Sequence, residues 1–453
     1  MSLFQKLKNL IGKGHERTVK AKKNILLSII YKGIGILIGF AYFPISLEYL
    51  GPAKFGVFLT LTSVIDWFAE FDIGIGNGLR NKMGEAIADG DHKKARAYVS
   101  TAYFAVGSIF SGASVVFIGV CFLLPWADLL QADPSWNNEI AIMAMLMFAA
   151  FAIDFVSRLV YQIFYALQRT AAISLFSLIS KVSFLLLIIF LLYFTEQSLI
   201  LFGAAKTFTF AAVPLIVGIY YFKNDFKQYR PSFKLAKRSL FKDIFSLGVQ
   251  FFIIRMAMLV IHQTNNILIA RLVSIEEVPA YEASYKYMSI FLTLFVIMTN
   301  QLWGASIEAY RKKDMEWMKN TVRTVVKIWF ATILLSIIMI LCSPFVFKIW
   351  LQGRIEIPLM LTVAVTISIA FTNWVNMFNL ILNGTGKIRI QMYAWILASI
   401  INIPLSIFLA KTMGLGTIGI VLGTVFSMVP LIIISPIQVR KVLRLKDKGI
   451  WAK

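Results

Sequence analysis

Long apolar stretches separated by short polar connections dominate this chain of 453 residues. A membrane-spanning helix needs about 20 predominantly apolar residues, and twelve segments of the sequence meet this requirement. They run from about 25 to 49, 55 to 76, 100 to 125, 139 to 167, 171 to 193, 198 to 222, 246 to 270, 279 to 304, 324 to 347, 356 to 382, 392 to 410 and 416 to 437. The pattern predicts an all-α integral membrane protein with about twelve transmembrane helices and almost no soluble domain.

Composition and charge distribution support this interpretation. Hydrophobic residues make up 58% of the chain and charged residues only 15%, although the formal net charge is +22. In a soluble protein such a charge would suggest nucleic acid, but most Lys and Arg residues lie in the two tails and in alternate connections. The opposite connections hold only Lys54, Arg271, Lys348, Arg354 and Lys411. The positive-inside rule therefore predicts that both termini are cytoplasmic, and we expect no nucleic-acid partner.

The two halves of the sequence repeat at an offset of 223 residues. The matched pairs are Lys32 with Arg255, Asn77 with Asn300, Leu79 with Leu302, Glu85 with Glu308, Asp91 with Asp314, Arg96 with Lys319 and Val99 with Val322. The repeat predicts two pseudo-symmetric six-helix bundles, at 25–222 and 246–437, joined by a basic cytoplasmic linker at 223–245. A basic segment at 1–24 and a basic tail at 438–453 flank them.

Six cations lie inside the predicted spans, where each costs about 2.5–3.5 kcal/mol. They are Lys32, Arg158, Lys181, Lys206, Arg255 and Lys286. Asp154 precedes Arg158 by four residues, and Glu282 precedes Lys286 by the same spacing, so salt bridges within one helix are one interpretation for those two cations. Lys206 and Lys286 lie nearer the outer helix ends, where long side chains can reach the interface.

Lys32, Lys181 and Arg255 have no acid three or four residues away on their own helices. At 1.5 Å per residue they lie on the order of 10–15 Å from the predicted cytoplasmic helix ends. Two interpretations stay open. In one, the acids Asp66, Glu70 and Asp72 pair with Lys32 across a helix interface; in the other, the cations line a water-filled cavity whose positive potential suits phosphate or acidic sugars.

The remaining polar residues are less specific. Cys121 and Cys342 lie in apolar helices without a CxxC motif or a nearby histidine, so we expect neither a disulfide nor a metal site, and no cofactor. His262 lies in a span beside amide side chains, where it suits either a polar cavity or a helix-packing hydrogen bond. Asn373, Asn376, Asn379 and Asn383 make one side of a predicted span polar, which fits sugar hydroxyls or ordinary helix contacts equally.

Three segments carry a family resemblance. These are YLGPAKFGVFLTL at 49–61, DIGIGNGLRNKMGEAIADGDHKKARAYVSTAYF at 72–104 and their partner ASIEAYRKKDMEWMKNTVRTVV at 305–326. With them, the chain resembles the oligosaccharide and polysaccharide (O-antigen, Wzx-type) flippases of the MOP exporter superfamily. The resemblance covers essentially the whole chain and implies a MATE-like fold in a bacterial inner membrane. It also implies movement of undecaprenyl-diphosphate-linked oligosaccharide from the cytoplasmic to the outer leaflet, for O-antigen, capsule or exopolysaccharide synthesis.

The family has no universal signature for its site, but cations that line a central cavity are a theme of it. The positions that fit this theme are Lys32, Arg158, Lys181 and Arg255, while Asp66 and Asp154 are candidates for ion coupling. The resemblance implies a transporter rather than an enzyme. Membrane lipids, a polysaccharide polymerase and glycosyltransferases are the expected partners besides the lipid-linked substrate.

Two other functions are alternatives to this one. An ion-coupled multidrug exporter of the same superfamily would suit an interior dominated by acids, and Asp66, Glu70 and Asp154 keep it open. A membrane polymerase or glycosyltransferase would need a catalytic acidic cluster or a large outer loop. The longest predicted outer loop is only 126–138, which weighs against such an enzyme.

Overall fold

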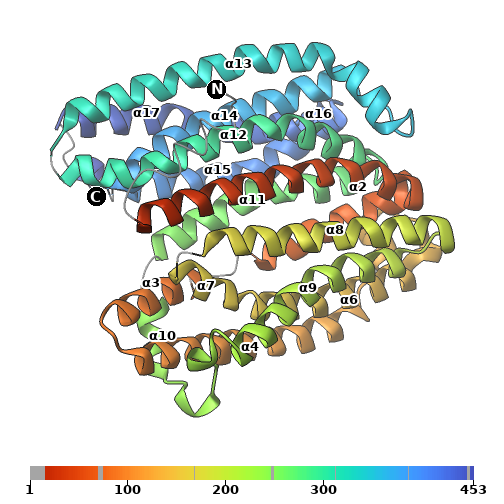
Figure 1. Ribbon diagram of the computed structural model, residues 1–453. Helices are drawn as coiled ribbons and strands as arrows, with labels where there is room; N and C mark the ends of the chain where they lie inside the picture. Colours follow the sequence, from red (N-terminus) through yellow and green to blue (C-terminus); the bar gives the residue numbers. More distant parts are fainter. Residues whose placement is uncertain are drawn as a thin grey trace, which may run out of the picture. The chain divides into compact units, whose positions relative to one another are not determined.

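The computed structural model describes residues 16–69, 75–167, 169–245, 249–311, 313–385, 387–445 and 449–452, and all secondary structure there is helical (Figure 1). The α-helices are α2 (Glu16–Ala69), α3 (Ile75–Ala88), α4 (His92–Cys121), α5 (Trp126–Leu130), α6 (Asn137–Ser157), α7 (Leu159–Ala166), α8 (Thr170–Phe194), α9 (Leu199–Lys223), α10 (Arg238–Phe245), α11 (Val249–Leu272), α12 (Glu277–Arg311), α13 (Met315–Leu351), α14 (Leu359–Thr385), α15 (Arg389–Ile407), α16 (Gly416–Ser427) and α17 (Val429–Leu443). Short helical turns are η1 (Pro134–Trp136), η2 (Lys227–Tyr229), η3 (Phe233–Leu235), η4 (Phe408–Thr412) and η5 (Gly449–Ala452). Residues 1–15 of the predicted basic N-terminal segment lie outside the described residues.

Within the described residues, ten helical stretches are long and apolar enough to cross a membrane. One of them, Leu26–Asp66, contains two of the twelve predicted segments, and α12, which has 35 residues, covers the predicted segment at 279–304. The two segments in the first stretch are separated at Gly51, whose φ of 72° and ψ of 167° interrupt α2. The helices therefore account for the hydropathy pattern along the whole described chain.

The helices group into two compact units. Unit 1 comprises the described parts of Met1–Gly51, Phe71–Ala127 and Asp133–Gly248, and unit 2 comprises those of Pro52–Glu70, Asp128–Ala132 and Val249–Lys453. The part of α2 after Gly51 thus groups with unit 2, although it precedes the predicted linker in sequence. The division into bundles at 25–222 and 246–437 stays a prediction.

Each unit has an interior of large apolar side chains. In unit 1, Phe148, Phe164, Phe184 and Phe202 are fully buried, and α6 and α8 both pack against α9. In unit 2, Trp395 is fully buried in a cluster formed by α11, α14, α15 and α17. In a bilayer, close packing of such rings stabilises each unit through van der Waals contacts.

The outward faces of the long helices are also apolar. On α13 the exposed side chains include Leu334, Leu341 and Phe345, each at least two-thirds exposed, and on α8 they include Tyr193 and Phe194. A soluble protein does not present such continuous apolar surface to water. These faces are therefore the surfaces that contact lipid.

The 223-residue repeat is visible in the backbone of two turns. Between α3 and α4, the side chain of Asp91 accepts a hydrogen bond from the Lys94 backbone N at 2.9 Å; between α12 and α13, that of Asp314 accepts one from the Trp317 backbone N at 2.9 Å. The residue before each cap, Gly90 or Lys313, has a positive φ, of 76° and 58° respectively. The backbone bonds of Asp91 N to Ala86 O and of Asp314 N to Ala309 O also correspond. The repeat therefore extends from sequence to local structure.

Candidate functional site

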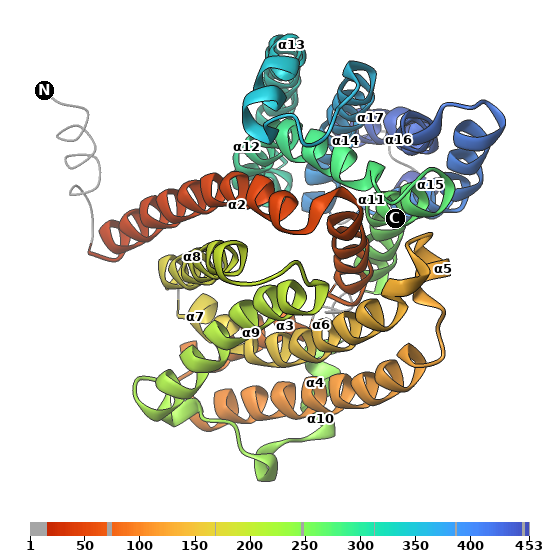
Figure 2. The same ribbon diagram turned by 90° about the vertical axis from the view of Figure 1, so that its right-hand side faces the viewer.

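The part of α2 before Gly51 and α8 run side by side in unit 1 (Figures 1 and 2), and Lys181 on α8 contacts α2 at Gly35. The Lys181 ammonium donates to the Gly35 carbonyl at 3.3 Å. A Cβ on Gly35 would lie 3.1 Å from Lys181 Nζ, so glycine lets the lysine reach the backbone of α2. Lys32 lies three residues before Gly35, hence on the same face one turn away, and it is exposed.

Lys206 is held by aromatic rings. Its ammonium lies 4.2 Å from the ring centroid of Phe210, 4.9 Å from that of Phe184 and 5.4 Å from that of Tyr42. These rings come from α9, α8 and α2 respectively, and each presents the negative face of its quadrupole to the cation. The sequence interpretation that Lys206 reaches the membrane interface did not include this cage, which depends on contacts between distant segments.

Arg158 forms an ion pair with Asp154. Arg158 Nε donates to Asp154 Oδ1 at 2.8 Å, and its Nη2 donates to the second carboxylate oxygen. The carboxylate is buried while the arginine side chain is half exposed, and Arg158 stands at the break between α6 and α7. The guanidinium thus donates to Asp154 on one side and is accessible on the other, whereas the buried carboxylate of Asp154 is held in this pair.

Arg255 and Asp66 lie in unit 2. Arg255 is on α11 and Asp66 is near the end of α2, and both side chains are exposed. Arg255 follows the buried Ile254 in the cluster around Trp395. A common cavity with Lys32, Arg158 and Lys181 stays a proposal.

A polar core in unit 2 was only partly visible in the sequence. Asn266 Nδ2 donates to Glu282 Oε1 and to Ser63 Oγ, each at 2.7 Å. These three residues stand on α11, α12 and α2. Glu282 thus accepts a hydrogen bond from the amide of another helix, and its pairing with Lys286 within one helix stays an interpretation from their spacing.

The same core continues through the neighbouring asparagine. Asn265 Nδ2 donates to Tyr281 Oη at 3.0 Å, and Asn265 Oδ1 accepts from Thr424 Oγ1 at 3.1 Å. Asn402 Nδ2 donates to Ser427 Oγ at 3.2 Å and to Thr424 Oγ1 at 3.4 Å. Consecutive asparagines inside an apolar helix were the available sequence signal. Such interhelical bonds fix the packing of α11, α12, α15 and α16.

The asparagines of α14 remain ambiguous between packing and binding. Asn373 and Asn379 are buried, and the side-chain oxygens of these two and of Asn383 have no hydrogen-bond partner within the described residues. Buried acceptors are normally paired. This edge of α14 thus retains hydrogen-bonding capacity that sugar hydroxyls or water would satisfy.

The apolar outer faces, the long helices and the charged positions inside them define a multi-pass membrane protein. Its sequence matches the family described as polysaccharide biosynthesis protein over residues 21–303, more than half of the chain. The chain belongs to this family.

Two relatives carry names related to O-antigen. A Salmonella typhi protein provisionally named an O-antigen transporter is 23% identical over 282 residues, which are 60% of this chain and 61% of that protein. A Yersinia pseudotuberculosis protein provisionally named an O-antigen export protein is 20% identical over 377 residues, 79% of this chain and 81% of that protein. The match thus spans less than two thirds of the length of the Salmonella relative.

Solved structures of multidrug MATE transporters share the fold. An inward-facing transporter of the MOP superfamily has a TM-score of 0.76 at 14% identity, with 92% of this chain and 99% of that chain covered. An outward-facing one has a TM-score of 0.66 at 14% identity, with 95% and 97% covered. At such identities the likeness establishes the fold alone. It confirms the predicted all-α, MATE-like membrane architecture.

Proposed function

We propose that this protein is a flippase that moves an undecaprenyl-diphosphate-linked oligosaccharide from the cytoplasmic to the outer leaflet of a bacterial inner membrane, with both of its termini cytoplasmic. Membership of the polysaccharide biosynthesis family and the O-antigen names of two relatives support the substrate class. The protein acts as a transporter rather than an enzyme. Polysaccharide polymerase and glycosyltransferases are its partners in the same assembly process.

The observation that carries the proposal is the set of cations inside the apolar helices. Lys181 contacts α2 at Gly35, one turn from Lys32, Arg158 is half exposed, and Arg255 occupies the repeat position of Lys32. Cations at membrane depth are costly, and a diphosphate or an acidic sugar is the kind of group that would compensate several of them. These four residues would hold the head group while the polyprenyl tail remains in the bilayer.

The transport step is alternating access. Several cations that each bind the head group with moderate strength suit this step better than one tight binding site, because the head group must be both recruited and released. We expect moderate binding strength from Lys181, which already contacts a neutral carbonyl, and from Arg158, whose charge is partly neutralised by Asp154. Asp66 and Asp154 are the candidates for coupling to an ion, and Arg158 holds Asp154 in an ion pair.

Depletion of the protein in cells tests the substrate. We expect lipid-linked oligosaccharide to accumulate on the cytoplasmic face, protected from a glycan-specific lectin added to intact spheroplasts, while total synthesis continues. Surface polysaccharide should fall in parallel. If the accumulated lipid-linked species is instead accessible from outside, the block lies after translocation and the flippase assignment is wrong.

An ion-coupled multidrug exporter is the second candidate, and the shared fold with multidrug MATE transporters supports it. The acids Asp66 and Glu282 would then be the relevant groups. Overproduction should raise the tolerance of a susceptible host to cationic dyes, and Asp66→Asn should remove that gain. No change in dye accumulation, together with a loss of surface glycan upon depletion, decides for the flippase.

A further inference from the structure

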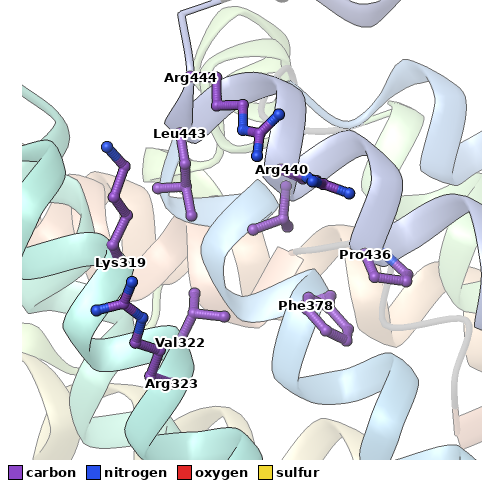
Figure 3. Close-up of a pocket in the computed structure, with 9 residues that line it drawn as sticks. Lys319, Val322, Arg323, Phe378, Pro436, Arg440, Leu443 and Arg444 are labelled. Carbon is purple, nitrogen blue, oxygen red and sulfur yellow. The ribbon is translucent and has the colours of Figure 1, made fainter.

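A basic pocket opens on unit 2 where α13 begins and α17 ends (Figure 3). Its volume is about 520 Å³. Lys319 and Arg323 come from α13, Arg440 comes from α17 and Arg444 caps its end, so each helix presents two cations at a spacing of four residues. The apolar part of the lining is Val322, Phe378, Pro436, Val439 and Leu443.

Among the described residues, no acid neutralises the four cations of this pocket. All four are exposed, and no acid lines the pocket. In the described part of the chain none of them forms an ion pair, and Arg323 Nη1 donates a hydrogen bond to Asn320 Oδ1 at 3.5 Å. Four like charges around one pocket repel one another, so an anionic ligand would stabilise this arrangement.

The corresponding face of unit 1 is covered by the chain itself. By the 223-residue offset, Lys319 matches Arg96 and Arg323 matches Ser100 on α4. Arg96 Nε donates to the Arg230 carbonyl at 2.9 Å, and Ser100 Oγ accepts from the Ser232 backbone N at 3.1 Å. The linker after α9 thus occupies this face in unit 1. In unit 2 the described residues Gly449–Ala452 (η5) pack elsewhere, on α15 and α17, with Trp451 against Lys441 at 3.7 Å.

Both helices extend the pocket into lipid-facing stripes. On α13, Arg323 and Lys327 are followed at helical spacing by the exposed Phe330, Leu334 and Leu341. On α17, the exposed Ile433 and Ile437 precede Arg440 and Arg444 in the same register. A ligand that fits therefore has an anionic head and an apolar tail, and the site lies at the level of a membrane interface, where basic clusters bind anionic lipids.

We propose that this pocket binds the phosphate head group of one anionic glycerophospholipid from the surrounding bilayer, between α13 and α17. The phosphate contacts the four cations, and the acyl chains lie along the apolar stripes of both helices. This lipid site is separate from the transport site and does not depend on the transported substrate.

Native mass spectrometry of the full-length protein in neutral detergent tests the proposal with added phosphatidylglycerol and phosphatidylcholine as probes. We expect the first phosphatidylglycerol to bind at least tenfold more tightly than phosphatidylcholine. Arg323→Gln with Arg440→Gln should weaken this binding at least tenfold. Lys319→Gln with Arg444→Gln, which removes the other half of the cation set, should do the same.

A matched control and a competitor complete the test. Lys93→Gln with Lys94→Gln removes two exposed cations from α4 of unit 1 and should change binding less than twofold, and all variants should keep the wild-type Tm in lipid-free detergent. Equal binding of the two phospholipids, or an equal loss in the control, would overturn the site. Displacement of phosphatidylglycerol by an equimolar polyprenyl diphosphate would overturn its assignment to a bilayer phospholipid.

Discussion

The turn between α3 and α4 and the turn between α12 and α13 have the same backbone but different surroundings. Asp91 and Asp314 cap the following helix with the same bond, and a left-handed residue precedes each. Around the first turn, however, the linker packs closely: His92 Nδ1 lies 3.0 Å from Tyr229 Oη, and α10 packs on α3 and α4. Around the second, the corresponding surface carries the open basic pocket.

The repeat preserves the local backbone of the two turns, whereas the packing around each turn differs between the units. Caps and left-handed turn residues are local, since they depend on one or two residues, and the repeat retains them. The covering of the surface depends on distant segments: in unit 1 the linker after α9 packs on α4, whereas in unit 2 the corresponding face carries the pocket. Corresponding positions therefore have different roles despite a common backbone.

The largest effect should come from Gly78→Ala in unit 1. A Cβ on Gly78 would lie 2.2 Å from the Ile244 carbonyl oxygen, so α3 and α10 would be forced apart, at a loss of about 3 kcal/mol. Gly84→Ala on the same helix is the control, because nothing lies within 4 Å of its Cβ. Thermal unfolding in detergent measures both. Equal stability of the two variants would show that the linker does not pack on α3 as described.

A smaller loss should follow Asp154→Asn, which leaves Arg158 without its carboxylate. We expect a destabilisation of about 2 kcal/mol, since a charge-assisted hydrogen-bonded pair is broken and one charge is left uncompensated. The double variant Asp154→Asn with Arg158→Gln should recover part of this loss because both partners are removed. Purely additive single effects in this cycle would contradict the ion pair.

The two caps should be equivalent. Asp91→Ala and Asp314→Ala each remove one capping bond of the same length, and each should cost about 1 kcal/mol. Unfolding measurements on the two single variants test whether the repeat seen in the amino-acid sequence is also a repeat of the structure. A twofold or greater difference between them would limit the repeat to the sequence.

The smallest effects should have opposite signs. Lys313→Gly should stabilise the protein by about 1 kcal/mol or less, because glycine adopts a positive φ without the Cβ clash that lysine meets. Gly90→Lys should destabilise it by a similar amount. The same thermal assay applies, and a change of the same sign in both variants would break the correspondence of the two turns.

Local and non-local features were not equally predictable from the sequence. The spans follow from hydropathy, and the pair of Asp154 and Arg158 follows from a spacing of four on one helix. The cage around Lys206, the bond from Lys181 to Gly35 and the bond from Asn266 to Glu282 join helices far apart in sequence, so periodicity alone could not reveal them. The basic linker was predicted as a connection, but its packing on α4 depends on Tyr229 and other tertiary contacts.

Glycan export by variants of the repeated cation pair tests the central claim most directly. Lys32→Ala, Arg255→Ala and Arg255→Lys would be compared in cells at matched protein levels, with surface polysaccharide as the readout. If these cations hold the anionic head group during transport, we expect at least a tenfold loss in each alanine variant and substantial rescue by Arg255→Lys, because the charge is what matters. Near-normal export in both alanine variants would contradict the account.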